Sequence, residues 1–235
     1  PVSITIGRLA ADSITLAPEV LGQPVEGRLT ATLGLSGGEG SADLLLERLD
    51  DGPSGRIALT ASYSNASQTL AIDLGATEGA NGLVVNALGI PGRPEAELTV
   101  KGKGPFTGFI ADLALSTNGA PRLAGRVVTQ SVTGQTGFAA NLAGDLAPLF
   151  LPDYAAFFGP SVSLVAQGTA HDDGRLDLTR AHLTAEALDL TGALSLAADG
   201  SPRSFDLQGR IAQPDGTAVL LPLTSDLPVR IQSAD

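Results

Sequence analysis

Residues 56–74, RIALTASYSNASQTLAIDL, contain two runs in which apolar and polar side chains alternate. Ile57 and Leu59 lie two residues apart in the first run, and Leu70 and Ile72 are spaced in the same way in the second. Successive side chains of a β-strand point to opposite faces, so each run predicts a strand with one apolar face. The segment SNASQ between the runs is rich in turn-forming residues, and the two strands are therefore expected to pair antiparallel.

The alternation continues along most of the chain, in runs that include Leu29, Ala31, Leu33 and Leu35; Phe109, Ala111, Leu113 and Leu115; and Phe205, Leu207, Gly209 and Ile211. Dipeptides typical of hairpin turns separate many of the runs, namely Asp51-Gly52, Asn118-Gly119, Asp173-Gly174, Asp199-Gly200 and Asp215-Gly216. Short alternating runs bounded by turn residues predict about fourteen strands. Their close spacing favours an antiparallel meander over βαβ units.

Two segments break the alternation and predict short helices. Residues 77–89 (TEGANGLVVNALG) form the first, which Gly89 and the following proline should end. Residues 145–158 (DLAPLFLPDYAAFF) form the second, with Asp145 as N-cap and Pro152 expected to kink or split the helix. A proline and new strands follow each segment about 65 residues apart, which predicts a weak internal repeat with units 77–144 and 145–213 within one region spanning 1–235.

Composition excludes several classes of function. The 235 residues include 25 acidic and 14 basic ones, a formal net charge of −11 that argues against a nucleic-acid partner and against electrostatic docking on anionic lipid. There is no cysteine, so disulfides, thiolate metal sites and cysteine nucleophiles are excluded. No apolar stretch reaches the ~20 residues of a membrane helix. Methionine is absent too, so we expect a mature protein or a fragment of a longer one.

The central question is what covers the apolar strand faces. Only seven Phe and two Tyr are present, few for a dry sandwich core of this size, and two short helices cannot cover fourteen strands. We therefore predict an all-β fold, an elongated, curled antiparallel sheet with an apolar groove, over the alternative of an ordinary sandwich core. A groove that exposes so much apolar surface needs a long, flexible, apolar ligand, and acyl chains meet that requirement.

The predicted groove-lining residues are those on the apolar phase of the strands: Leu29, Leu33, Ile57, Leu59, Leu70, Ile72, Leu74, Leu98, Val100, Phe109, Leu113, Leu115, Phe138, Leu142, Val162, Leu164, Leu176, Leu178, Leu194, Leu196, Phe205, Leu207 and Ile211. The aromatic-rich second helix is expected to plug the groove or gate it, through Leu149, Phe150, Tyr154, Phe157 and Phe158.

Three stretches resemble a known family. Residues 89–109 (GIPGRPEAELTVKGKGPFTGF) resemble the helix, loop, strand and Gly-x-Gly-Pro turn of AsmA-like proteins. Residues 142–164 (LAGDLAPLFLPDYAAFFGPSVSL) resemble the alphaproteobacterial TamB type, the translocation and assembly module subunit, and residues 209–230 are similar to it in character. Together they cover about a third of the chain, and the rest agrees in pattern only.

The resemblance implies a periplasmic "β-taco" sheet, attached to the inner membrane through segments outside this sequence. It also implies movement of phospholipid between the inner and outer membranes. A second implied role is assembly of outer-membrane proteins, with an Omp85-type outer-membrane protein as partner.

Other motifs have simpler structural explanations. His171 precedes Asp172 and Asp173 in a predicted hairpin turn, and His182 alternates with apolar neighbours as a solvent-facing strand residue. The Gly102–Pro105 segment (GKGP) resembles a phosphate loop only superficially, since Pro105 removes a donor and no helix follows. We therefore expect no catalytic residue, no metal site and no cofactor.

Three hypotheses follow. The first is a non-enzymatic groove that carries phospholipid acyl chains. The second is an assembly factor whose sheet edges pair with strands of a client outer-membrane protein. The third is a structural β-sandwich module with a closed core, and an enzyme is the least favoured reading.

Overall fold

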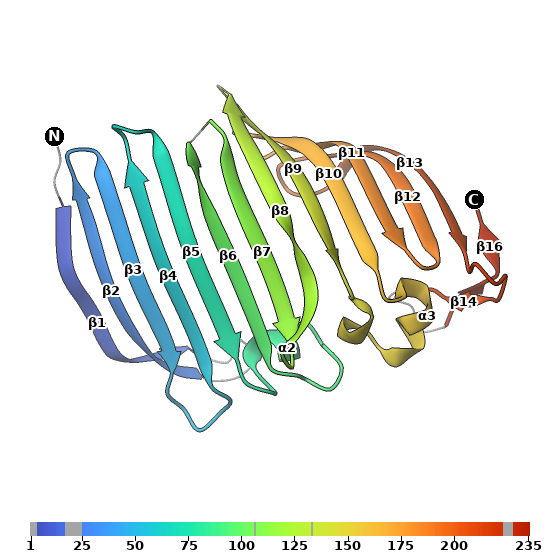
Figure 1. Cartoon of the computed structure of the whole chain (residues 1–235), viewed down its shortest axis with the longest axis horizontal. Coiled ribbons are helices and arrows are strands. Elements are labelled where there is room, and N and C mark those ends of the chain that lie inside the picture. The colour runs from blue at the N-terminus through green and yellow to red at the C-terminus, as the bar shows by residue number, and fades with distance from the viewer. Residues whose placement is uncertain (1–3, 17–24, 106, 133, 223–227) are drawn as a thin grey trace. The chain divides into compact units, whose positions relative to one another are not determined.

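The computed structural model describes residues 4–16, 25–105, 107–132, 134–222 and 228–235 (Figure 1). The chain divides into two compact units, residues 1–121 and 122–235. The first unit contains β1 (Ile4–Leu16), β2 (Val25–Ser36), β3 (Glu39–Arg48), β4 (Gly55–Ser64), β5 (Thr69–Glu78), α2 (Leu83–Ala87), β6 (Ala96–Pro105) and β7 (Phe109–Thr117). β8 (Ala120–Val132) begins in the first unit and lies mostly in the second.

The second unit continues with β9 (Gln135–Gly144), the 3-10 turns η1 (Ala147–Leu149) and η2 (Pro152–Tyr154), α3 (Ala155–Phe158), β10 (Val162–His171), β11 (Leu176–Ala185), β12 (Leu188–Leu196) and β13 (Pro202–Ala212). Three short strands end it: β14 (Val219–Leu220), β15 (Arg230–Ile231) and β16 (Ser233–Ala234).

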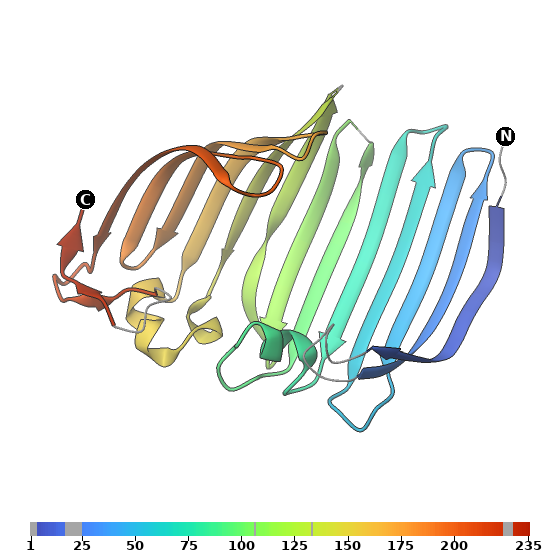
Figure 2. The same ribbon diagram turned by 180° about the vertical axis from the view of Figure 1, so that it is seen from behind.

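The strands form an antiparallel meander. Strands β1 to β13 follow one another in sequence order in a 14-stranded sheet, with β16 after β13, while β14 and β15 form a separate two-stranded sheet. Figures 1 and 2 show the strands of each unit side by side, with α2 in the connection from β5 to β6 and with η1, η2 and α3 in the connection from β9 to β10. At the β7–β8 turn, Asn118 and Gly119 have φ angles of 49° and 71°, the left-handed backbone that this dipeptide tolerates. The expected all-β, curled antiparallel sheet with two short helices is thus confirmed.

The first helix is shorter than predicted. α2 spans five residues, because Thr77 and Glu78 belong to β5 and pair with Glu97 and Ala96 of β6. The Glu78 carboxylate accepts hydrogen bonds from the N–H groups of Val84 and Val85, each at 2.9 Å. Glu78 therefore supplies partners for the first N–H groups of the helix, which lack intrahelical ones.

The second helix is split, as Pro152 predicts. A proline removes a backbone donor and clashes with the preceding turn, and here Pro148 and Pro152 each lie in a separate 3-10 turn before α3. The expectation that Asp145 caps a helix is wrong. Leu146 is the N-cap of η1, and the Asp145 carboxylate instead forms an ion pair with Arg122, 3.1 Å from the guanidinium.

Both helical segments are followed by four strands: β6 to β9 after α2, and β10 to β13 after α3. The compact units divide elsewhere, between Pro121 and Arg122. The repeat in the amino-acid sequence stays a prediction.

Few side chains are fully buried. The main buried cluster lies in the second unit, where Phe157, Ala187, Val219 and Leu221 pack together. Within the described part of each unit, the closest contacts between elements are almost all between neighbouring strands of the sheet.

A carboxylate fixes the end of the β2–β3 hairpin. Asp50 accepts hydrogen bonds from Arg48 Nε at 2.8 and 2.9 Å, from the Gly52 N–H at 2.8 Å and from the Glu26 N–H at 3.1 Å. The hydrogen bonds from Arg48, and then those from the two backbone N–H groups, hold the pKa of Asp50 well below its ordinary value of 3.8.

A pKa lowered by folding stabilises the protein above the unfolded-state pKa, and this contribution is lost as the pH falls through the lower folded-state pKa. We therefore predict that Asp50→Asn lowers the free energy of unfolding near neutral pH, and that the difference from wild type shrinks between about pH 5 and pH 2. Urea unfolding measured at a series of pH values checks this. The neighbouring Asp51→Asn is the matched control, and an equal pH response in both variants would refute the role of Asp50.

Candidate functional site

In the first unit, strand register places apolar side chains on one face in continuous rows. Residues opposite each other on paired strands share a face. Three rows run across β2 to β7: Leu29, Leu46, Ile57, Ala76, Leu98 and Leu115; Ala31, Leu44, Leu59, Leu74, Val100 and Leu113; and Leu33, Ala42, Ala61, Ile72, Gly102 and Ala111. We name this surface, together with Leu70 and Phe109, the first apolar face. It contains all twelve predicted lining residues of this unit.

The second unit has an equivalent surface, the second apolar face. Its rows across β9 to β13 are Leu142, Leu164, Leu183, Leu190 and Gly209; Ala140, Ala166, Ala181, Gly192 and Leu207; and Phe138, Gly168, Leu178, Leu194 and Phe205. The other predicted residues, Val162, Leu176, Leu196 and Ile211, lie in the same phase of their strands.

A β-bulge keeps the second apolar face in phase. Gln167 of β10 is opposite Arg180 of β11, but the next residue, Gly168, is opposite Leu178, so β11 contains one extra residue. A one-residue shift would otherwise turn the following apolar side chains to the other face. Because of the bulge, Leu178 and Ala181 both lie on the apolar side although they are three residues apart.

The opposite face of each unit is polar. Lys101 lies across from Asp73 and forms an ion pair with it at 3.2 Å, on the polar side of the sheet. The Thr60 hydroxyl donates to the Asp43 carboxylate at 3.0 Å, and His182 is 3.0 Å from Asp189. These contacts satisfy polar groups locally, and His182 occupies the polar strand position expected of it.

The apolar faces are only partly buried. Ile57 is 40% exposed and Leu33 39%, although both lie in the apolar rows. A hollow of about 400 Å³ opens on the first apolar face, and its lining includes Ile6, Leu33, Leu35, Tyr63 and Leu70. Large apolar side chains with this exposure indicate a surface that can accept an apolar ligand.

A short helix lies at one end of each face. Glu78, which is opposite Ala96 on the first apolar face, holds the N-terminus of α2 there. In the second unit, Phe157 of α3 is buried in a cluster against which Leu188 and Ile211 pack, two residues of the second apolar face. Figure 2 shows α2 beside the ends of β5 and β6.

The predicted gate segment is anchored. The N–H groups of Glu186 and Ala187, in the β11–β12 turn, donate to the carbonyl oxygens of Phe158 and Phe157 at 3.2 and 3.1 Å. Phe158 also stacks on Phe150, with ring centroids 4.1 Å apart. Phe157 is buried and Phe150 is exposed, while Leu149, Tyr154 and Phe158 are half-buried. Moving this segment would break the backbone hydrogen bonds and the Phe157 packing, and gating stays a prediction.

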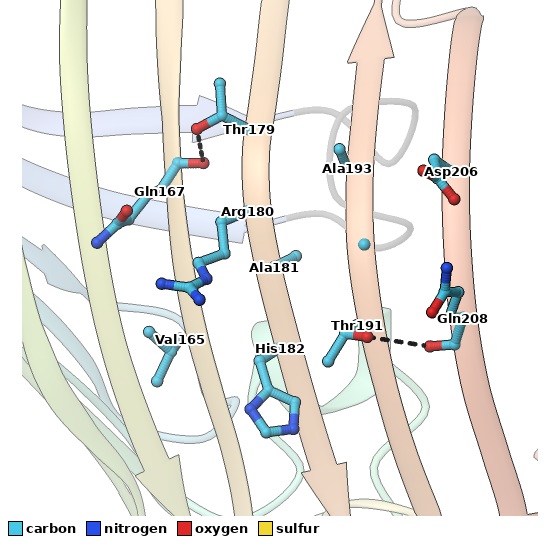
Figure 3. A pocket seen from close by; sticks show the side chains of 11 residues that line it. Val165, Gln167, Thr179, Arg180, Ala181, His182, Thr191, Ala193, Asp206 and Gln208 are labelled. Carbon is cyan, nitrogen blue, oxygen red and sulfur yellow. Dashed lines mark hydrogen bonds between the residues drawn. The ribbon is translucent and has the colours of Figure 1, made fainter.

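A hollow of about 650 Å³ lies mainly on the polar side of the second unit (Figure 3). Its lining includes Gln167, Arg180, His182, Asp206 and Gln208. The Thr179 hydroxyl donates a hydrogen bond to the backbone oxygen of Gln167 at 3.3 Å, and the Thr191 hydroxyl donates one to that of Gln208 at 3.4 Å (Figure 3). The hollow lies at the bulge in β11, and a bulge increases the local twist of a strand. Arg180 and Asp206 bring charges of both signs to its lining. The shape of the twisted polar surface therefore explains the hollow.

The remaining candidate residues have structural roles. His171 ends β10 at the turn predicted for it, and its Nε2 lies 2.7 Å from the Asp177 carboxylate. Hydrogen bonds from the Ser195 hydroxyl and from His171 lower the pKa of Asp177. The Gly102–Pro105 segment is the end of β6 and not a phosphate loop, followed by a tight turn in which the Gly108 N–H donates to the Pro105 oxygen.

Several residues of the apolar faces were missed. Leu44 and Leu46 of β3 lie in the rows of the first face, but the run Leu44-Leu45-Leu46 hides the alternation. The polar neighbours Asp43 and Glu47 fix the phase and could have revealed it. Leu183 and Leu190 of the second face were missed as well, although each lies between two polar residues that indicate its phase.

No group of three or more His, Cys, Asp or Glu side chains among the described residues could hold a metal ion. Nor does any helix of the described part of the chain have the length and apolarity to cross a membrane. Comparison with family models, curated proteins and solved structures found no match to the chain.

The exposure of the apolar faces predicts that the native protein enhances the fluorescence of 8-anilinonaphthalene-1-sulfonate. The triple variant Leu59→Gln, Leu74→Gln, Val100→Gln alters three adjacent residues of one row and should weaken this enhancement. The control variant Ala58→Gln, Ala71→Gln, Ala114→Gln changes the polar side and should not. Equal losses in the two variants would show that the dye does not report the first apolar face.

Proposed function

We propose that this chain is a non-enzymatic lipid-transfer module whose apolar faces bind phospholipid acyl chains. The observation that carries the proposal is the exposure of two apolar faces, each of which has, among the described residues, a short helix at one end. Headgroups would stay in water beyond the edges of the faces.

The chemistry of the faces suits transport. Burial of a methylene group is worth about 0.8 kcal/mol and has little directional demand, so a chain bound by many such contacts can slide without breaking specific hydrogen bonds. The rows consist mainly of Leu, Ile, Val and Ala, which offer no polar group to stop it.

The resemblance of residues 89–109, 142–164 and 209–230 to AsmA-like and TamB-type proteins supports the same proposal. On that basis we propose a periplasmic location, attachment to the inner membrane through segments outside this sequence, and exchange of phospholipid between inner and outer membranes. An Omp85-type outer-membrane protein is the proposed protein partner.

A second candidate function is strand pairing with a client outer-membrane protein. It is favoured by the edge of β13, which pairs along its length with β12 but meets β16 only at Ile211 and Ala212. Phe205 and Leu207 on this strand are 71% and 51% exposed. An incoming strand would complete the hydrogen bonds of β13 and cover both side chains.

Photo-crosslinking distinguishes the two functions. We predict that benzoylphenylalanine at Leu113, on the first apolar face, labels radioactive phospholipid, and that the same group at neighbouring Ala114 gives only background. Native mass spectrometry of the purified protein should show bound phospholipid. Equal labelling at the two positions would contradict a one-sided lipid site, and polypeptide crosslinks from β13 without bound lipid would favour strand pairing.

A further inference from the structure

Two aromatic rings on the apolar faces lie over glycines of the neighbouring strand. A β-carbon added to Gly102 of β6 would lie only 2.7 Å from Cε1 of Phe109 on β7. One added to Gly168 of β10 would lie 2.8 Å from Cζ of Phe138, the residue directly opposite on β9. Both glycines are buried, and real β-carbons essentially never approach so closely. Each ring therefore needs a glycine beneath it.

This arrangement reduces the distance by which the aromatic rings project from the apolar faces. Side chains of a strand usually stand roughly perpendicular to the sheet, where an aromatic ring would project far above the neighbouring Leu and Ala side chains. A ring that lies over a glycine projects much less. Gly102 also faces Ile72 and Ala111 in register, so the first apolar face is shallow at this point.

Glycine inside a strand usually weakens it, and it marks close approach by another group. One such glycine–aromatic pair lies on each apolar face. Pairing of a ring with a cross-strand glycine is also a known way to stabilise a sheet. A test must therefore separate ligand binding from stability.

We propose that the Gly102–Phe109 and Gly168–Phe138 pairs keep the two phenylalanine rings close to the sheet, so that acyl chains can lie across the first and second apolar faces. In this role the two glycines do not contact the ligand themselves; they leave the space that the Phe109 and Phe138 rings occupy. The inference rests on the proposed lipid-transfer function and specifies its ligand as a slender, flexible hydrocarbon chain that passes over the two rings.

Gly102 is the better position to test. A β-carbon there meets side chains, the Phe109 ring and Ala111 Cβ at 3.2 Å, whereas at Gly168 it would also collide with the backbone oxygen of Asp177. Gly102→Ala should push the Phe109 ring away from the sheet, so that the ring projects from the first apolar face. Gly75→Ala is the matched control, because Gly75 lies on the polar side of the adjacent strand β5 and its added β-carbon meets nothing within 4 Å.

The experiment measures binding of a phospholipid with a fluorescent acyl chain to folded protein, with thermal unfolding recorded for every variant. Gly102→Ala should weaken binding about fourfold, the effect of one lost methylene contact. The double variant Gly102→Ala, Phe109→Leu should restore binding, since the smaller side chain no longer projects, and Gly75→Ala should bind like wild type.

The outcomes separate the inference from the function on which it rests. If Gly102→Ala lowers the melting temperature but binds lipid like wild type, the pairs only stabilise the sheet and the inference is overturned. Failure of Phe109→Leu to rescue binding also overturns it. If the wild-type protein binds no phospholipid at all, the proposed function falls together with this inference.

Discussion

Strand register is the constraint on which the rest of the structure depends. In the three rows across β2 to β7, each aliphatic side chain of one strand faces an aliphatic side chain or a glycine of the next. A shift of one residue in any pair would turn half of those side chains to the polar side. Gly37 and Gly38, with φ angles of 62° and 86°, form the turn that joins β2 to β3 in this register. In the second unit, the bulge in β11 keeps the apolar side chains in phase. Consistent register creates an apolar surface larger than the described residues cover.

The polar side supports the same arrangement. Cross-strand contacts such as Asp73 with Lys101 and Asp43 with Thr60 satisfy the charges and hydroxyls of that side within the sheet. Exposed charged residues also keep sheet surfaces from associating with other chains. The net charge of −11 acts in the same direction. Each unit is thus polar on one side of the sheet and apolar on the other.

Alternation in the sequence was sufficient to predict the antiparallel meander and many side chains of each apolar face, because period two is a local property of the chain. It did not reveal Leu44, Leu46, Leu183 and Leu190. Helix bounds were less predictable: Thr77 and Glu78 extend β5 because they find partners on β6, a tertiary effect. The role of Glu78 in holding α2 depends on the fold and has no motif of its own.

Features that depend on contacts between strands could not be predicted. The bulge that keeps Leu178 and Ala181 on one side is visible only in the register of β10 with β11. The position of the Phe109 ring over Gly102 requires knowledge of which strands are adjacent. Burial of Phe157 against the β11–β12 turn likewise comes from residues distant in sequence, so a helix predicted as a gate proves to be anchored at its end.

Methyl-labelled NMR of the protein with phospholipid tests the central claim most directly, because the chain has matched residues on its two sides. Leu59, Ile72 and Val100 lie on the first apolar face, while Leu45 and Ile110 lie on the opposite side of the same unit. Our account predicts nuclear Overhauser contacts from acyl methylenes to the first three residues and none to the other two. Contacts of equal strength on both sides, or none on either, would contradict it.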